Sequence, residues 1–372
     1  MIETNAGDLS YLLQILSPPV QSGGGALDSP YIYFVGNENN PPILHTYNRH
    51  MSVTLRLLSD DCEEFEALVE HDQLSNCISN HEDEDEILLD FSNPRELIVK
   101  STRGTYRFKT ASADSFRMKQ TKAEEHLGSI DGDTLTHLID AAGIFMAKSR
   151  GAGLMDSVHL YFDPETSTIS AATEDRSILA HFTAPAEQII TEARVTLIGS
   201  MMRKISNFPG ESTIDIYRDP RHNRIIFQGE YGRLAVASLT DKNARIDGHM
   251  QLFAQERPDG MHVDRKAFKQ ALARMSSWDA EHIVAKITPG GVVLEVLDRD
   301  KTGAKENPMD ATATKEMKIY MNMDQMNRIL KLSKEESLDI KLETERYSAV
   351  VTGQTGSLDY QIVFAAVSNR KN

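Results

Sequence analysis

Residues 324–342 read DQMNRILKLSKEESLDIKL, and this stretch holds the unit from which the whole chain is built. Its first part places apolar side chains at Met326, Ile329 and Leu330, which is the spacing of one face of an amphipathic helix. A polar turn follows, and residues 338–342 then alternate apolar and polar side chains, which is the period of a half-buried strand. The stretch therefore predicts a helix that leads through a short turn into a strand.

The same unit returns along the chain at a spacing of about 60–67 residues. An extended segment precedes each helix, and two or three alternating segments follow the turn. The helices are expected at residues 9–16, 72–78, 134–147, 198–205, 266–275 and 324–332. A repeated β-α-β-β-β unit builds a symmetric scaffold, whereas catalysis needs one asymmetric pocket. The repeat therefore favours a binding protein over an enzyme.

The length of the chain predicts more than one domain, because 372 residues exceed one ordinary core. With two units in each domain, we expect an α+β protein of three tandem domains at residues 1–122, 123–252 and 253–372. Polar residues mark both boundaries, near 121–127 and near 252–260.

The composition is that of a soluble globular protein, with 40% hydrophobic and 26% charged residues. The 55 Asp and Glu outnumber the 40 Lys and Arg, and the net charge of −15 argues against indiscriminate coating of nucleic acid or anionic membrane. A locally basic surface stays compatible with DNA contact. The start of the sequence lacks the features of a signal peptide, and no window approaches the ~18 apolar residues of a membrane span. We expect a cytoplasmic protein without membrane contact.

Other motifs that could carry chemistry are weak. Cys62 and Cys77 are the only cysteines, and no Cys/His spacing is typical of a metal site, so reduced cytosolic thiols are the simplest interpretation. The acidic run at residues 81–86 is either a metal or catalytic cluster or a solvated turn, and the turn is favoured. Residues 23–25 are three glycines without the Lys-Ser/Thr that would meet phosphate, which favours a surface loop. Mobile loops are expected at residues 21–29 and 298–316, and we expect no metal and no cofactor.

Basic side chains recur opposite the apolar stripes of the expected helices. The candidates are Arg203 and Lys204 in the fourth unit, Lys266 and Arg274 in the fifth, Arg328 and Lys331 in the sixth, and Lys148 and Arg150 just past the third helix. They form either ordinary solvated helix faces or a functional basic surface. Their recurrence in so acidic a chain favours the functional surface. The two helices of the first third carry no Lys or Arg.

Over essentially its whole length the sequence resembles the bacterial DNA polymerase sliding clamp, the β processivity subunit. Residues 155–162 (MDSVHLYF) and 169–176 (ISAATEDR) are similar to the clamp's strand pair that ends in its ATDGHRLA motif. Residues 195–239, 262–274 and 359–367 resemble later parts of the family's second and third domains. The family's Gly-His stands here as Asp175-Arg176, its terminal Pro-Met-Arg is absent, and the first third matches weakly. The chain thus resembles a divergent clamp, of bacterial or phage origin.

This resemblance implies a homodimer that closes head to tail as a ring around double-stranded DNA. Helices would line the hole and sheets would form the outer layer. Such a ring binds DNA without reading its sequence and tethers the replicative DNA polymerase for processive synthesis, in the bacterial cytoplasm or a phage-infected host. The basic residues named above would contact the DNA. A ring used mainly as a mobile platform for transcription or repair factors is an alternative, and a repeat-built hydrolase is another, for which no catalytic motif is present.

The family also implies a partner site, where the DNA polymerase and the clamp loader insert short linear peptides between the second and third domains. By position its lining would be Leu154, Thr173, Arg176, Ile178, Ile246, Phe253, Ile362, Val363 and Phe364. An apolar groove with few polar anchors suits peptide capture. A second interpretation stays open, since Ile178, Ile362 and Val363 could equally be strand core.

Ring closure implies that an edge strand of the first domain pairs with one of the third domain of the neighbour. Tyr106 and Phe108 lie in the first-domain strand, and Met275 and Trp278 lie near the third-domain side. Trp and Tyr favour the centres of interfaces. For Trp278, the only tryptophan, a role inside its own domain remains the alternative.

Overall fold

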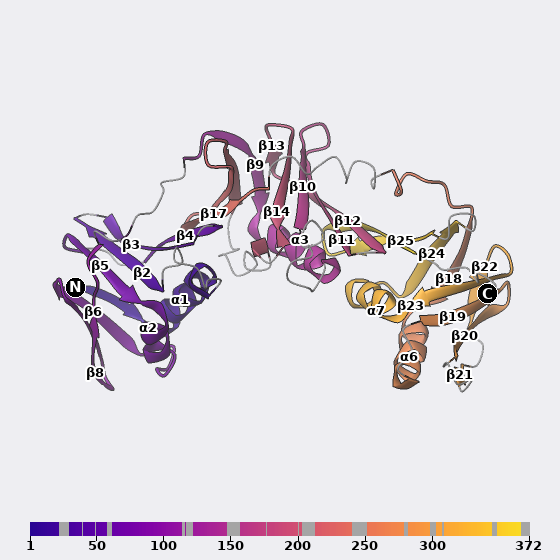
Figure 1. The fold of residues 1–372 in the computed structure, drawn as a ribbon, viewed down its shortest axis with the longest axis horizontal. Coiled ribbons are helices and arrows are strands. Elements are labelled where there is room, and N and C mark those ends of the chain that lie inside the picture. Colours follow the sequence, from indigo (N-terminus) through magenta and orange to yellow (C-terminus); the bar gives the residue numbers. More distant parts are fainter. Residues whose placement is uncertain are drawn as a thin grey trace. The chain divides into compact units, whose positions relative to one another are not determined.

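The computed structural model describes most of the chain (Figure 1). The chain divides into two compact units. The described residues are 1–21, 30–38, 40–48, 50–57, 62–113, 116, 122–146, 157–175, 177–199, 201–202, 213–239, 251–278, 282–297, 303–306, 309–343 and 348–365. Unit one comprises residues 1–136, 186–192 and 200–240, and unit two comprises residues 137–185, 193–199 and 241–372.

Unit one begins with two copies of the expected β-α-β-β-β order. The first copy is β1 (Ile2–Asn5), α1 (Ala6–Gln21), β2 (Tyr31–Asn37), β3 (Asn40–Tyr47) and β4 (Met51–Arg56). The second copy is β5 (Phe65–Glu70), α2 (His71–Ile78), β6 (Glu86–Asn93), β7 (Glu96–Ser101) and β8 (Gly104–Lys109). The unit also contains β9 (Glu125–Asp131), the start of α3, β13 (Gln188–Ile189), β15 (Thr213–Asp219), β16 (Arg224–Gln228) and β17 (Gly232–Ala237).

Unit two has the same kind of elements. Its first group is the rest of α3 (Gly132–Phe145), β10 (Ser157–Asp163), β11 (Thr168–Asp175), β12 (Ile178–Pro185) and β14 (Ala193–Ile198). Next come β18 (Asp259–Asp264), α6 (Arg265–Met275), the 3₁₀ helix η3 (Ser276–Trp278), β19 (His282–Thr288), β20 (Gly291–Leu297), β21 (Gly303–Lys305) and β22 (Ala311–Ala313). The last group is β23 (Met317–Asn322), α7 (Met323–Leu332), β24 (Ser337–Glu343), β25 (Ser348–Thr355) and β26 (Leu358–Ala365).

Neighbouring repeats exchange their first strands. The strand before each helix pairs with the first strand after the other helix of the same pair, as in β1 with β6 and β5 with β2. The same exchange joins β9 to β15, β14 to β10, β18 to β24 and β23 to β19. Because the first strand of one repeat completes the sheet of the other, neither repeat of a pair forms a complete sheet alone.

The third strand after a helix joins one pair of repeats to the next. In unit one, β17 pairs antiparallel with β4, and this pairing creates the nine-stranded sheet β13-β9-β15-β16-β17-β4-β3-β2-β5. In unit two, β12 pairs with β26 in the same way, in the sheet β14-β10-β11-β12-β26-β25-β24-β18-β22. The four-stranded sheets β1-β6-β7-β8 and β21-β20-β19-β23 each end in a third strand, β8 or β21, that lies at a sheet edge.

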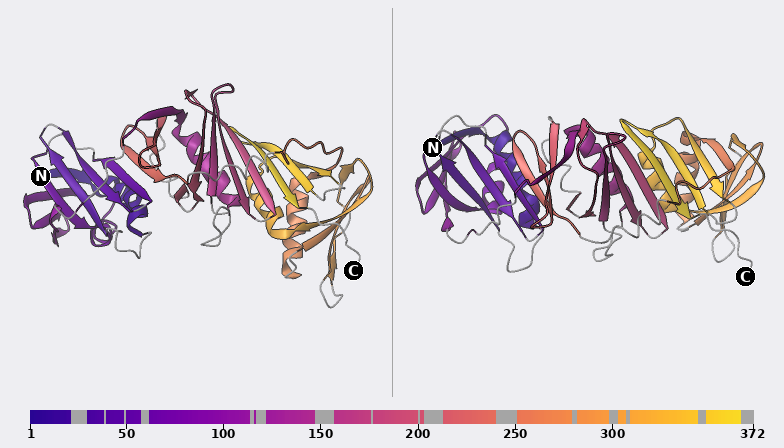
Figure 2. Two further views of the ribbon diagram at one scale, coloured as in Figure 1. Left: turned by 45° about the horizontal axis from the view of Figure 1, so that its top comes forward. Right: turned by 90° about the horizontal axis from the view of Figure 1, so that it is seen from above.

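The core of each unit lies between its sheets and its helices (Figure 2). On α1, Leu9, Leu13 and Leu16 are buried at helical spacing, and α1 packs against α2. The ring Nε2 of His71 on α2 donates to the carbonyl oxygen of Leu13, 3.0 Å away, which ties the two helices together. Among the described residues, no helix is both long and apolar enough to cross a membrane.

Most of the elements expected from the sequence are present. Five of the six expected helices correspond to α1, α2, α3, α6 and α7, and the expected strand at 338–342 lies within β24. Of the fourth helix, only residues 199 and 201–202 are described, and they are helical. The expected loop at 21–29 lies outside the described residues apart from residue 21, which ends α1. The expectation of a mobile loop at 298–316 was wrong for residues 303–305 and 311–313, where β21 and β22 pair with β20 and β18 respectively. Residues 298–302 and 307–308 of that range lie outside the described residues.

Candidate DNA-contact and partner-binding surfaces

Helices α6 and α7 of unit two expose lysines and bury apolar stripes. Asp264 caps α6, its carboxylate accepting a hydrogen bond from the amide of Ala267 at 2.6 Å, and Asn322 caps α7 in the same way. The two helices pack on each other. Lys266 and Lys331 are exposed, as the sequence predicts. Lys269, one turn beyond Lys266, is exposed as well; its spacing could have revealed it, but it was not among the candidates.

Arg274 is exposed but already has a partner. Its guanidinium makes two hydrogen bonds to the carboxylate of Glu306, of 2.9 and 2.7 Å, just beyond β21. The same contact lowers the pKa of Glu306. Arg274 therefore connects the last turn of α6 to the edge strand of its sheet, and only part of its donor capacity remains for DNA.

Arg328 was expected to point to solvent, and this expectation was wrong. Its side chain is only 12% exposed and lies between two carboxylates, those of Asp175 and Asp324, each 2.7 Å away. Asp324 is one turn earlier on α7, and Asp175 ends β11. The helical pattern placed Arg328 opposite the apolar stripe, but the β11–β12 turn occupies that side of the helix.

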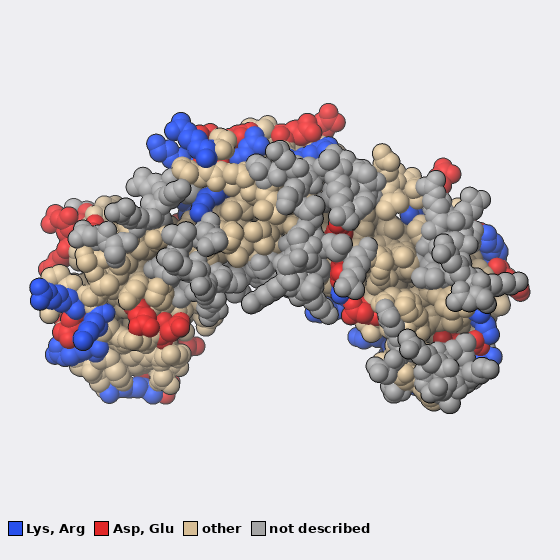
Figure 3. Space-filling model, in the orientation of Figure 1, with Lys and Arg blue, Asp and Glu red and all other residues tan. Residues whose placement is uncertain are grey.

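The other basic candidates, Lys148, Arg150, Arg203 and Lys204, lie outside the described residues, as do Leu154, Arg176 and Ile246 of the expected peptide site. Figure 3 shows Lys and Arg interspersed with Asp and Glu on the face that it presents, without a continuous basic surface there. Of the basic candidates, Lys266, Arg274 and Lys331 are therefore the described ones with exposed side chains.

Four residues of the expected peptide site share one face of the nine-stranded sheet of unit two. Across β11, β12 and β26 the register aligns Thr173 with Ala180 and Ile362, and it aligns Ile178 with Phe364. All four are buried. The hydroxyl of Thr173 has no hydrogen-bond partner among the described residues.

Val363 and Phe253 lie on the opposite face, so the expectation that they line the same pocket was wrong. Alternate residues of a strand point to opposite faces, and Val363 follows Ile362 directly. Its partner in the register is Leu179. The ring of Phe253 lies 5.6 Å from that of His181, which is on this second face, next to Leu179 along the strand.

Burial beside Phe253 lowers the pKa of His181 to about 4. The neutral ring is favoured in the folded protein, whereas the unfolded chain binds a proton near pH 6.5. The contribution of His181 to the free energy of unfolding is therefore fully present above pH 6.5. It is lost as the pH falls toward 4, by about 1 kcal/mol per pH unit. We expect His181→Gln to flatten this fall in urea unfolding measured between pH 7 and 4.5. His262→Gln, at an exposed histidine of β18, is the control. Equal slopes in wild type and His181→Gln would contradict the assignment.

Exposed aromatic side chains lie on the edge strand β8 and just beyond α6. On β8, Tyr106 is 37% exposed and Phe108 is half-buried, and in the register they face the buried Val99 and Leu97 of β7. The ring of His81 lies edge-on to Tyr106 at 5.7 Å. Beyond α6, Trp278 is 41% exposed. Met275 is fully buried among the core residues of α6, so its expected place at a subunit interface was wrong.

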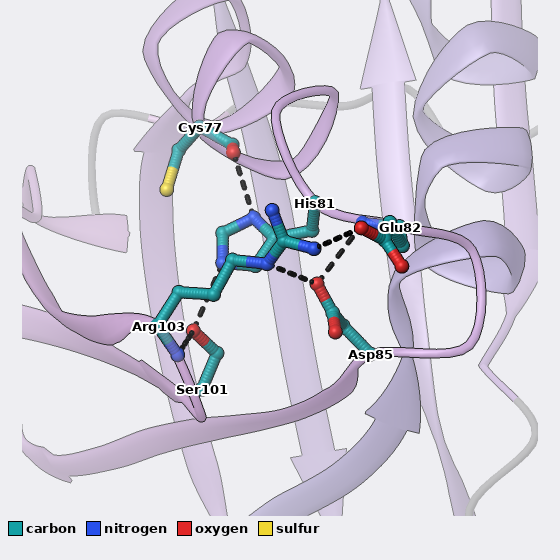
Figure 4. Close-up of polar contacts among 6 residues, drawn as sticks. All are labelled: Cys77, His81, Glu82, Asp85, Ser101 and Arg103. Carbon is teal, nitrogen blue, oxygen red and sulfur yellow. Dashed lines mark hydrogen bonds and ion pairs between the residues drawn. The ribbon is translucent and has the colours of Figure 1, made fainter.

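The acidic run after α2 forms a turn that anchors the β7–β8 hairpin (Figure 4). The guanidinium of Arg103 contacts Glu82 at 2.6 Å and Asp85 at 2.8 Å. His81 donates through Nδ1 to the carbonyl of Cys77, and its Nε2 lies 2.9 Å from the Ser101 hydroxyl. Among the described residues, no group of His, Cys, Asp and Glu side chains is arranged to hold a metal ion. The turn thus positions the edge strand β8.

Comparison with known proteins identifies the fold. No family model matches the sequence, and no curated protein matches it. The crystal structure of the DNA polymerase III beta subunit from Thermotoga maritima superposes with a TM-score of 0.86 at 14% identity, covering 99% of both chains. The beta chain from Streptococcus pneumoniae gives 0.85 at 15% identity, covering 99% of this chain and 100% of that one. A Pseudomonas aeruginosa sliding clamp bound to griselimycin gives 0.87 at 15% identity, again covering 99% of each chain.

These similarities extend over nearly the full length of each chain at low sequence identity. They confirm the predicted fold: this chain has the mixed α and β architecture of the DNA polymerase III beta sliding clamps.

Proposed function

We propose that the protein is a sliding clamp, which encircles duplex DNA and tethers the replicative DNA polymerase. The observation that carries this proposal is the full-length match of its fold to bacterial clamps. The repeated β-α-β-β-β order and the exposed lysines of α6 and α7 agree with it. Such a protein is a processivity factor rather than an enzyme, and it works in the cytoplasm, where bacterial DNA is replicated.

The exchange of first strands supports three domains, at residues 1–122, 123–252 and 253–372. Each exchange joins two repeats that lie in the same third of the chain. The two compact units divide the middle third because each of its sheets continues into a neighbouring third, through β17–β4 and β12–β26. The middle third is a domain whose two sheets are both shared.

The same pairing rule supports a ring of two copies. Four third strands pair within the chain, as β4 with β17 and β12 with β26, whereas β8 and β21 lie at sheet edges. Pairing of β8 in one copy with β21 in the next would extend the rule to all six repeats. Because the two edges differ, the contact is head to tail, and two such contacts close a homodimer.

DNA contact in this proposal is electrostatic and independent of sequence. Lysine side chains that reach phosphates release counterions, and a smooth surface without base contacts can slide. Lys266, Lys269 and Lys331 supply such charges, with Arg274 in a partial role. The net charge of −15 would keep other parts of the surface from binding DNA.

The partner peptides of the polymerase and of the clamp loader would bind at the face formed by Thr173, Ile178, Ile362 and Phe364. Their common face and apolar character support this assignment. Because these side chains are buried, they would form the floor of the site, and Leu154, Arg176 and Ile246 are proposed for its rim.

A topological test addresses the function directly. We expect the protein, once loaded, to be retained on nicked circular DNA and to be released when a restriction enzyme linearises the circle, because a closed ring leaves only over an end. Size-exclusion chromatography of the DNA–protein complex before and after cutting measures this. Equal loss from circular and linear DNA would contradict encirclement.

A further inference from the structure

The β11–β12 turn of one repeat is held by side chains of another repeat far along the chain. Asp175 ends β11, and one of its carboxylate oxygens lies 2.7 Å from Nη1 of Arg328 on α7. The side-chain Nε2 of Gln325, one turn earlier on α7, donates to the hydroxyl of Ser177 at 2.5 Å. The carbonyl of Ser177 in turn accepts from the amide of Ala365 at the end of β26, at 2.9 Å.

These contacts are largely shielded from water. The side chains of Asp175 and Arg328 are 17% and 12% exposed, and Gln325 is buried. Ion pairs on an open surface contribute little, whereas removal of one partner from a shielded pair leaves a charge without compensation. The contacts therefore have the burial needed to fix the geometry of the turn.

The shape of the arginine side chain suits this corner. Its Nη1 faces Asp175 while its Nε lies 2.7 Å from Asp324 on the same helix, so the planar guanidinium spans two carboxylates at once. A lysine presents a single ammonium and could not serve both carboxylates in this geometry.

We propose that Asp175, Arg328 and Gln325 form a latch that fixes the β11–β12 turn and the end of β26 against the start of α7. Arg328 is thus a positioning residue. If the proposed function holds, the latch shapes the partner-peptide face, because Thr173 and Ile178 flank the turn and Phe364 precedes Ala365. Since Lys331 lies one turn beyond Arg328 on α7, the latch also joins the peptide face to a helix that would contact DNA.

Hydrogen–deuterium exchange measured by mass spectrometry on the full-length protein tests this latch. In Arg328→Met we expect exchange in the segments 177–182 and 358–365 to rise on the order of tenfold, because local opening frees the amide of Ala365. Arg328→Lys should show an intermediate rise.

Arg274→Met is the matched control, since it breaks a two-point ion pair on the neighbouring helix, away from the turn. It should leave both segments unchanged. The thermal unfolding midpoint of every variant separates local from global effects: a rise in exchange that merely follows a lower midpoint would overturn the latch, as would equal exchange in Arg328→Met and Arg274→Met. Light scattering on the same samples reports the ring separately, so a monomeric wild type would count against the proposed function and not against the latch.

Discussion

Tyr106→Glu is expected to convert the dimer into monomers, because it places a charge on the exposed edge that we propose for ring closure. Truncating an aromatic anchor at the centre of an interface costs about 2 kcal/mol or more. A closed homodimer contains the contact twice, so the loss is roughly 4 kcal/mol, or about a 10³-fold weaker dimer. Trp278→Glu, just beyond α6 and proposed for the other side of this contact, should act to the same extent. Light scattering during size-exclusion chromatography measures both masses.

Mixing the two variants distinguishes a head-to-tail contact from any other dimer. The Tyr106→Glu variant keeps an unaltered β21 edge, and the Trp278→Glu variant keeps an unaltered β8 edge. These two edges can therefore pair with each other and form one unaltered contact. We expect the mixture to give an open heterodimer that does not stay on circular DNA. Tyr11→Glu, at an exposed tyrosine of α1, is the control and should remain dimeric. If Tyr106→Glu stays dimeric or the mixture stays monomeric, the proposed pairing of edges is wrong.

Local sequence pattern predicts the repeated elements well. The apolar spacing in α7 and the alternation in β24 each reflect burial against the residue's own domain, which is why the helix at 324–332 and the strand at 338–342 were found. The strands β21 and β22 were missed for the opposite reason. They are short and lack large apolar side chains, and they owe their structure to pairing with β20 and β18, the latter about 50 residues earlier in sequence.

For the site residues too, local pattern predicts contacts within an element but not contacts with distant parts of the chain. The side of Arg328 that faces solvent in an isolated helix is covered here by Asp175, which is 153 positions away, and nothing in the helix sequence reveals such a partner. Two other errors were avoidable. Adjacent strand residues such as Ile362 and Val363 cannot line one face, and Met275 belongs to the stripe that the helical period assigns to the core.

The helix lysines are expected to govern the affinity for DNA and not the topological link. Lys266→Glu/Lys331→Glu removes two candidate phosphate contacts in each protomer, and so four in a dimer. Each lost contact lowers the slope of log affinity against log salt by about 0.9, so the slope should fall by nearly 4 and binding of a short linear duplex should weaken by about 10³-fold at low salt. The lifetime of a closed ring on nicked circular DNA should change little, since opening of the ring limits that lifetime.

Lys318→Glu/Lys341→Glu is the matched control, because both lysines are exposed on the strands β23 and β24 rather than on α6 or α7, and the charge change is the same. Fluorescence anisotropy of a labelled duplex over a salt titration gives the slopes, and light scattering verifies that every variant is a dimer. A similar slope for the two double variants would mean that the affinity for DNA depends only on the net charge of the protein and not on the helix lysines. The fold would then stand, but DNA would have to be held elsewhere, and Lys148, Arg150, Arg203 and Lys204 would be the next residues to reverse.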